Sequence, residues 1–183
     1  PGRLQHWDLQ IEQFTSPEPL QVLRLGPLPA SRRLEAWLQR QAGVQVLITE
    51  GEPRHLDPLN LSQQWSGGVA AWCAQQTMDP SSLLPSTWLK RDQAIGSWLA
   101  DQLPAEGPIS EPALAFQLAQ LLPPGLPVML AASSPVRDWL TWSGRAGSNR
   151  RCFSFRGASG IDGTLSLAMG LAIETGPTLL ITG

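Results

Sequence analysis

The sequence is short of the residues on which many functional sites depend. It has two cysteines, Cys73 and Cys152, two histidines, His6 and His55, a single lysine and no tyrosine. It contains no C-x-x-C pair and no pair of histidines at a helical spacing, so a zinc site is not expected. Because two cysteines do not make a disulfide framework, we expect both to be buried free thiols.

Charge and long apolar runs are also scarce. Only 15% of the 183 residues are charged, and the formal net charge is -2, which argues against a nucleic-acid partner because phosphates require a positive surface. No apolar stretch approaches the roughly 20 residues that span a bilayer, and the first ten residues lack the apolar core of a secretory signal. We therefore expect no membrane span and a cytoplasmic location.

Strand and helix patterns alternate in the first half of the chain. Apolar runs at 21–25 and 44–49 predict two strands, and the helical pattern between them begins at Ser31, a residue suited to the N-cap. Such a strand–helix–strand unit implies parallel strands joined by a right-handed crossover. Residues 51–67 are rich in turn formers, and helices are predicted over 68–76 and from about residue 86 to Leu103.

The pattern repeats after a proline- and glycine-rich boundary at residues 104–108. The predicted strands are 126–132, 151–155 and 178–182, and the predicted helices start at Ser110, at Ser134-Pro135 and after a capping Asp162. Residues 144–149 are expected to be a loop. The sequence thus predicts an α/β protein with parallel sheets flanked by helices, and its final strand suggests a piece of a longer protein.

Apolar residues at helical spacing indicate the core. We expect four tryptophans to be buried, Trp37, Trp72, Trp88 and Trp98. Two later helices are expected to bury one face each. These faces are Leu114, Leu118, Leu121 and Leu122 on the first, and Leu165, Ala168, Met169 and Ala172 on the second.

One candidate site follows the strand at 126–132. Ser133-Ser134-Pro135 leads into a helix N-terminus, where unpaired N–H groups and the helix dipole favour an anion. Arg137, one turn into the helix, offers a planar guanidinium suited to a carboxylate or phosphate. The residues leave open the alternative that Ser134 only caps the helix and that Arg137 pairs with a surface acid such as Asp138.

A second candidate site follows the strand at 151–155. Arg156 precedes glycines at 157, 160 and 163, a pattern that matches neither the dinucleotide fingerprint nor the P-loop. Glycines at this density let the backbone approach a ligand closely. If the two strands are neighbours, Arg156 and Arg137 would meet at one rim; the alternative is a plain glycine turn beside a solvated arginine.

These segments together resemble the MenD family, the 2-succinyl-5-enolpyruvyl-6-hydroxy-3-cyclohexene-1-carboxylate synthases. The resemblance rests on Ser133-Ser-Pro-Val-Arg-Asp138, Arg156-Gly-Ala-Ser-Gly-Ile-Asp-Gly163 and Pro177-Thr-Leu-Leu-Ile-Thr-Gly183. Two earlier segments, Val22–Gly26 and Arg54–Pro58, are similar to the family's central domain. The resemblance implies a thiamine-diphosphate enzyme with Mg²⁺ or Mn²⁺. It would decarboxylate 2-oxoglutarate and add the succinyl semialdehyde unit to isochorismate in menaquinone or phylloquinone biosynthesis.

By matched position, the resemblance also implies roles for individual residues. Ser133, Arg137 and Arg156 would contact substrate carboxylates and the cofactor-bound intermediate. Ile161 would be the catalytic apolar pillar beneath the bent cofactor. The physical chemistry agrees, because arginine forks suit carboxylates and an apolar prop does not compete for the cofactor's nitrogens.

The resemblance further implies cofactor contacts and a domain division. Gly160, with Ile161, would lie against the cofactor, and Gly183 would open the diphosphate and metal motif, in which an Asp normally comes next. No metal ligand is therefore assigned within the chain. Residues 1–107 would be part of the central α/β domain and 108–183 the start of the diphosphate-binding domain.

Part of the family pattern has no counterpart in this sequence. Its N-terminal pyrimidine-binding domain, with the glutamate that activates the cofactor, is missing, so we expect the 183 residues alone to be inactive. The family's site lies between subunits, which implies a homodimer or homotetramer. Two alternatives remain open: another thiamine-diphosphate enzyme, resembling acetohydroxyacid synthase or an oxoacid decarboxylase, and a non-catalytic α/β interaction domain.

Overall fold

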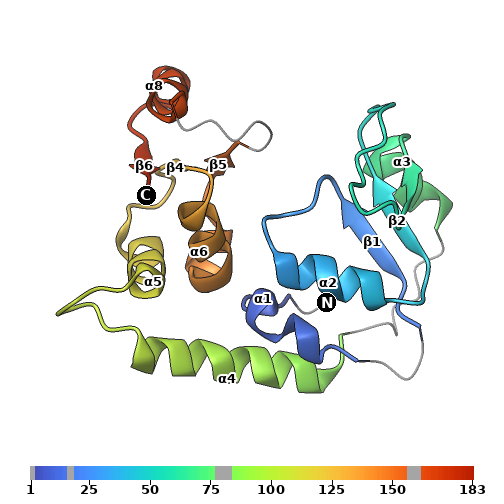
Figure 1. Ribbon diagram of the computed structural model, residues 1–183, viewed down its shortest axis with the longest axis horizontal. Helices are drawn as coiled ribbons and strands as arrows, with labels where there is room; N and C mark the ends of the chain where they lie inside the picture. The colour runs from blue at the N-terminus through green and yellow to red at the C-terminus, as the bar shows by residue number, and fades with distance from the viewer. Residues whose placement is uncertain (1–2, 16–18, 77–83, 156–161) are drawn as a thin grey trace. The chain divides into compact units, whose positions relative to one another are not determined.

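The computed structural model describes residues 3–15, 19–76, 84–155 and 162–183. Packing divides the chain into two compact units, residues 8–88 and residues 3–7 with 89–183, and each has its own three-stranded parallel sheet (Figure 1). The predicted α/β class with parallel sheets flanked by helices is confirmed. The break between the units falls inside helix α4 (Ser86–Gln102), so these packing units are a different division from the predicted domains.

The first unit contains the strand–helix–strand pattern. Its sheet has the order β1-β2-β3, with β1 (Val22–Leu25), β2 (Gln45–Ile48) and β3 (Gln63–Trp65). Helix α2 (Arg32–Arg40) connects β1 to β2, and its first turn is capped as predicted, since the Ser31 hydroxyl accepts the Leu34 N–H at 3.0 Å. Strand β3 was not predicted, because three polar and aromatic residues among turn formers carry no strand pattern.

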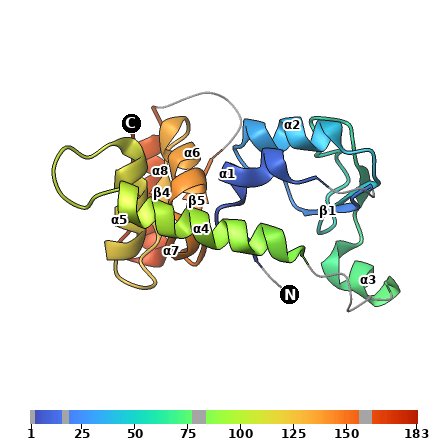
Figure 2. The ribbon, with the colours of Figure 1, turned by 90° about the horizontal axis from the view of Figure 1, so that it is seen from below.

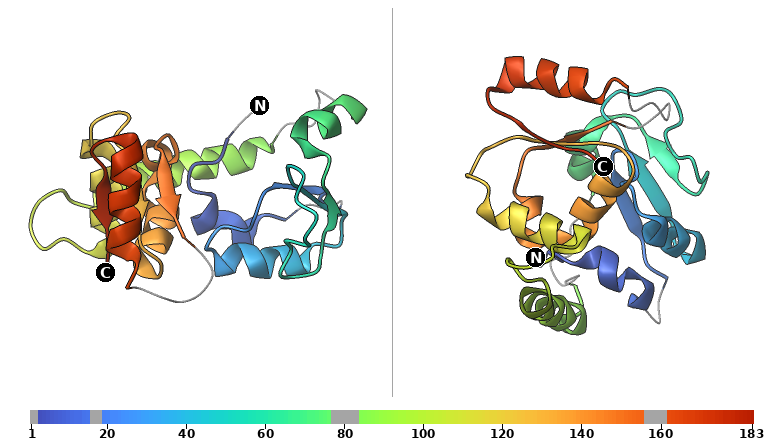
Figure 3. Two further views of the ribbon diagram at one scale, coloured as in Figure 1. Left: turned by 90° about the horizontal axis from the view of Figure 1, so that it is seen from above. Right: turned by 60° about the vertical axis from the view of Figure 1, so that its left-hand side comes forward.

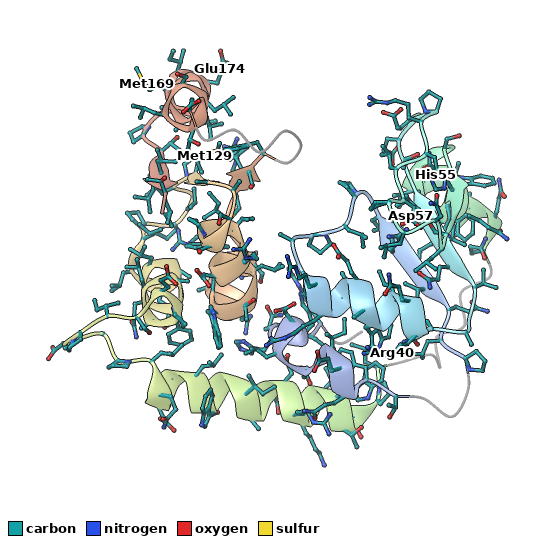
Figure 4. The ribbon with its side chains drawn as sticks, in the orientation of Figure 1. Arg40, His55, Asp57, Met129, Met169 and Glu174 are labelled. Atoms are coloured by element: carbon teal, nitrogen blue, oxygen red, sulfur yellow. The ribbon has the colours of Figure 1, made fainter. Side chains whose placement is uncertain are left out.

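The connection from β2 to β3 is held by one buried carboxylate rather than by a helix. Asp57, labelled in Figure 4, accepts the backbone N–H groups of Leu61 and Ser62 at 2.8 Å and the Arg24 guanidinium at 2.9 Å. Burial alone would raise the pKa of Asp57, but the hydrogen bonds from Ser62 and Arg24 outweigh it and hold the pKa well below its usual range. The two segments that resemble the family's central domain are thus joined by an ion pair.

The second unit is built around a buried central strand. Its sheet has the order β5-β4-β6, with β4 (Val128–Leu130), β5 (Cys152–Ser154) and β6 (Leu179–Ile181). The crossovers from β4 to β5 and from β5 to β6 run in opposite directions, so right-handed connections place their helices on opposite faces. Helices α5 (Glu111–Leu121) and α6 (Ser134–Trp142) cover one face and α8 (Thr164–Thr175) the other (Figures 1 and 3).

The remaining helices complete the two units. They are α1 (Trp7–Gln10), the 3-10 turn η1 (Ile11–Gln13), α3 (Gly68–Gln75) and α7 (Gly144–Ser148). Helix α7 corrects the prediction of a loop over 144–149, because two glycines and a serine among its five residues obscure the helical pattern. The second half of α4 crosses α5 and α6 on their side away from the sheet (Figures 1 and 2). Within the described residues no helix is long and apolar enough to cross a membrane.

Small residues form more of the helix packing than predicted. The core of the second unit is Ala119, Val128, Leu130 and Trp139. Helix α5 buries its alanines at 113, 115 and 119, which allows a close approach to α6, and Leu118 and Leu122 pack against the core as expected. The prediction was wrong for Leu114 and Leu121, which are 42% and 73% exposed.

Several other burial predictions are also wrong. On α8, Ala168 is buried, but Leu165 and Met169 are more than half exposed. Figure 4 labels Met169 on this outer helix and the buried Met129 on β4. Trp98 is 57% exposed, because it lies outside the face of α4 that buries Asp92 and Leu99. The other three tryptophans predicted to be buried are partly buried. Both cysteines are exposed, Cys73 on α3 and Cys152 on the edge strand β5.

We predict that Asp57→Asn destabilises the protein by about 3 kcal/mol at pH 7, because it leaves the buried Arg24 without its carboxylate. Because the folded-state pKa of Asp57 lies below the unfolded value of about 4, its contribution is present above that pH and is lost as the pH falls. Urea unfolding of the full-length protein, followed by tryptophan fluorescence at several pH values, measures both effects.

The matched control is Glu52→Gln, which breaks the exposed pair between Glu52 and Arg54 at 2.8 Å. Arg54 lowers the pKa of Glu52 to about 2 through its hydrogen bonds, yet solvent screens this pair and its loss should leave the urea midpoint almost unchanged. Equal effects of the two substitutions would refute the assignment of Asp57 as the centre of this connection.

Candidate functional site

The carboxyl ends of β4 and β6 form the topological switch point of the second sheet. The chain leaves β4 for β5 on one side and returns to β6 on the other, and β4 pairs in parallel with both. Open α/β sheets bind ligands in the crevice at such a point, because the two connections diverge there. Ser133 follows β4 and Gly183 follows β6, so the fold brings these two predicted site residues to the same edge of the sheet.

A small cavity lies at this edge. Its volume is about 100 Å³, and its wall includes Ser134 and Pro135 of α6 together with Thr182 and Gly183. A Cβ atom on Gly183 would lie 3.8 Å from Cδ of Pro135, which is ordinary van der Waals contact. The first turn of α6 and the end of β6 are therefore direct neighbours. Unpaired N–H groups at the start of α6 give this edge the donors that an anionic group needs.

Ser133 has an unusual backbone conformation. Its φ is 80° and its ψ is -132°, and Asn60 is the one other non-glycine residue with positive φ in the described part of the chain. A non-glycine residue in such a conformation costs about 1–3 kcal/mol, and residues of this kind cluster at functional sites. Ser133, rather than the predicted Ser134, occupies the N-cap position of α6, and its side chain makes no capping hydrogen bond.

The Ser133 hydroxyl contacts Arg137 instead. The Arg137 guanidinium donates to this hydroxyl at 3.4 Å, and both side chains are exposed. Among the described residues Arg137 forms no ion pair within 4.0 Å, so the alternative of a surface pair with Asp138 is not what the structure shows. The exposed Arg137 guanidinium and the Ser133 hydroxyl therefore lie side by side at the switch-point edge.

Three predicted site residues lie outside the described residues. They are Arg156, Gly160 and Ile161. The strand that leads to them, β5, pairs in parallel with β4, with Leu130 opposite Ser154, so β5 also ends at this edge. The position of the Arg156 side chain stays a prediction. Gly163, rather than the predicted Asp162, is the N-cap residue of α8.

An acidic pair that the sequence does not predict lines the cavity. Glu111 of α5 and Asp138 of α6 both line it. Burial raises the pKa of Asp138, Glu111 raises it further, and Arg137 and Trp142 act in the opposite direction. No sequence signal could have revealed this pair, because the two residues meet only once α5 packs on α6. The described residues contain no cluster of three or more possible metal ligands.

Three curated relatives of this chain carry the same enzyme name. Over the whole chain it is 78% identical to the 2-succinyl-5-enolpyruvyl-6-hydroxy-3-cyclohexene-1-carboxylate synthase of Synechococcus sp. strain CC9902 and 64% identical to that of Parasynechococcus marenigrum. The chain belongs to the MenD family. It spans about a third of the length of these curated relatives, and the synthase of Prochlorococcus marinus strain NATL1A, at 47% identity, shares both the name and this coverage. No protein-family model matches the chain.

We predict that Ser133→Gly stabilises the full-length protein by about 1 kcal/mol, because glycine adopts positive φ without strain, although it loses more entropy on folding. Ser133→Ala removes the same hydroxyl but keeps the strain, so its free energy of unfolding should stay near that of the wild type. Urea unfolding of both variants measures the difference. Equal stability of the two variants would show that position 133 is not strained.

Proposed function

We propose that the full-length protein is a thiamine-diphosphate-dependent carboligase of menaquinone or phylloquinone biosynthesis. It decarboxylates 2-oxoglutarate and transfers the succinyl semialdehyde unit to isochorismate. The observation that supports this proposal is the switch-point edge, where Ser133, which contacts the exposed Arg137, follows β4 and Gly183 follows β6. The name shared by the relatives agrees with it.

The residues at this edge suit the two substrates. Both substrates carry carboxylates, and a guanidinium binds a carboxylate through two charge-assisted hydrogen bonds. The Arg137 guanidinium is exposed, and one of its nitrogens donates a hydrogen bond to the Ser133 hydroxyl at 3.4 Å. We assign Arg156 to a second carboxylate. The buried Pro135 and Trp139 line the cavity, and an apolar wall of this kind keeps water from reacting groups.

The same edge suits the cofactor. Thiamine diphosphate, bound with Mg²⁺ or Mn²⁺, supplies the stabilisation of negative charge on carbon that decarboxylation requires. Gly183, with no side chain, lets the backbone at the end of β6 approach a diphosphate, and the N-terminus of α6 adds N–H donors beside it. We assign Gly160 to the cofactor contact and Ile161 to the pillar that supports its bent conformation.

Four further assignments are part of the proposal: the domain division, the location, the oligomeric state and the inactivity of these residues alone. Residues 1–107 belong to the central α/β domain and 108–183 to the start of the diphosphate-binding domain. The active enzyme is a cytoplasmic homodimer or homotetramer, and the 183 residues alone are inactive, because the glutamate that activates the cofactor belongs to another domain of the family.

The test of the proposed function uses the full-length protein with thiamine diphosphate and Mg²⁺. Loss of 2-oxoglutarate that depends on isochorismate supports the proposal. Turnover of pyruvate without any dependence on isochorismate would identify a different thiamine-diphosphate enzyme. No turnover of either oxoacid would instead indicate a binding domain without catalysis.

We predict that Arg137→Ala lowers kcat/KM for the carboxylate substrate by roughly 10- to 150-fold, because it removes a charge-assisted contact of about 1.5–3 kcal/mol. Steady-state kinetics of the full-length enzyme measure this loss. The matched control is Arg145→Ala, which removes an exposed arginine from α7 and should leave the kinetics unchanged. Unchanged kinetics in Arg137→Ala would remove this residue from the site.

We also predict that Ile161→Ala lowers kcat more than it raises KM, because the pillar acts on the cofactor's conformation and not on substrate affinity. Kinetics at saturating cofactor, with the melting temperature measured alongside, separate the two roles. A lower melting temperature with normal kcat would make Ile161 an ordinary packing residue.

A further inference from the structure

One buried titratable group has no part in the proposed reaction. His6 is 8% exposed and lies in the segment 3–7, which packs with the second unit. Asp92, buried on α4, accepts the backbone N–H of His6 at 2.8 Å and that of Gln5 at 2.9 and 3.1 Å through its two oxygens. One carboxylate therefore holds two successive N–H groups of the segment.

Two glycines make room for the His6 ring. A Cβ atom on Gly96 of α4 would lie 3.1 Å from Nε2, and one on Gly144 would lie 2.6 Å from Cε1. Gly144 has a φ of 57° and directly follows Ser143, the C-cap of α6. The imidazole thus fits closely between α4 and the junction of α6 with α7. Its Nδ1 has no hydrogen-bond partner among the described residues.

The surroundings of the ring favour its neutral form. Burial lowers the pKa of His6, and the nearby Asp92 raises it by less, so the pKa lies below the usual 6.5. The glycines that enclose the ring bring no charge of their own. Asp8, two residues further along the chain, binds Ser31 and Arg33 instead. Arg3 on the segment and Arg145 on α7 are exposed and cationic, so they offer no compensation to an imidazolium.

We propose that His6 is a pH-sensitive clasp, whose neutral ring fastens residues 3–7 between α4 and the α6–α7 junction and whose protonation releases them. The inference is independent of the proposed catalytic function. The packed state binds fewer protons than the released state, so packing is fully stable above about pH 6.5 and weakens as the pH falls. The clasp acts at the C-terminal end of α6, the helix whose first turn carries Arg137.

Hydrogen exchange of the Gln5 and His6 amides in the full-length protein tests the clasp. Between pH 8 and pH 5, protection corrected for the intrinsic exchange rate should stay constant down to about pH 6.5 and then fall by up to about tenfold per pH unit. The lower limit keeps ordinary carboxylates ionised. His6→Asn should give weaker protection that does not change with pH, whereas His55→Asn, which alters the exposed histidine of the other unit, should behave as the wild type.

A second pair of variants keeps the test decisive if His6→Asn does not fold. Gly144→Ala places a methyl group against the ring and should abolish protection even at pH 8. Gly125→Ala carries a similar cost of positive φ, 80°, but has no atom within 4 Å, so protection should persist. Equal protection in these two variants, or an equal fall with pH in the wild type and His6→Asn, would overturn the proposal.

Discussion

The parallel pairing of β4 with a strand on each of its edges is the constraint on which the second unit depends. All three residues of β4 are at most 5% exposed, so helices must cover both faces of the sheet. The order β5-β4-β6 then follows from two crossovers in opposite directions. The candidate site is the edge of the sheet at which these two connections diverge. The position of the candidate site is thus a product of topology, and Ser133 and Arg137 are the residues that we assign to it.

The strands and helices of this fold were predictable where local signals agree with packing. Ser31 and Ser110 cap their helices through their hydroxyls, as their types and positions indicate. The errors arose where tertiary structure decides. Strand β3 exists because β2 offers an edge and Asp57 holds the loop before it, and α5 turns its alanines inward because α6 packs closely there. Composition alone ranks leucine above alanine as a core residue, so the buried face of α5 could not be read correctly.

The candidate site was predictable in position but not in conformation. A serine, a helix start and an arginine after a buried strand indicate a site at a strand end, and the family motifs single out the same residues. The positive φ of Ser133 was not predictable, because this conformation normally calls for glycine. The neighbouring acids Glu111 and Asp138 belong to different helices, and only their packing brings them to one cavity.

The β2–β3 connection has a consequence for how the chain can vary. A helical crossover spreads its stabilising contacts over a whole face, whereas this loop concentrates them on the single anionic centre Asp57. Tolerance to substitution should therefore be uneven along the loop. Residues distant from Asp57 can vary, whereas Asp57 and its buried partner Arg24 must be kept or replaced together.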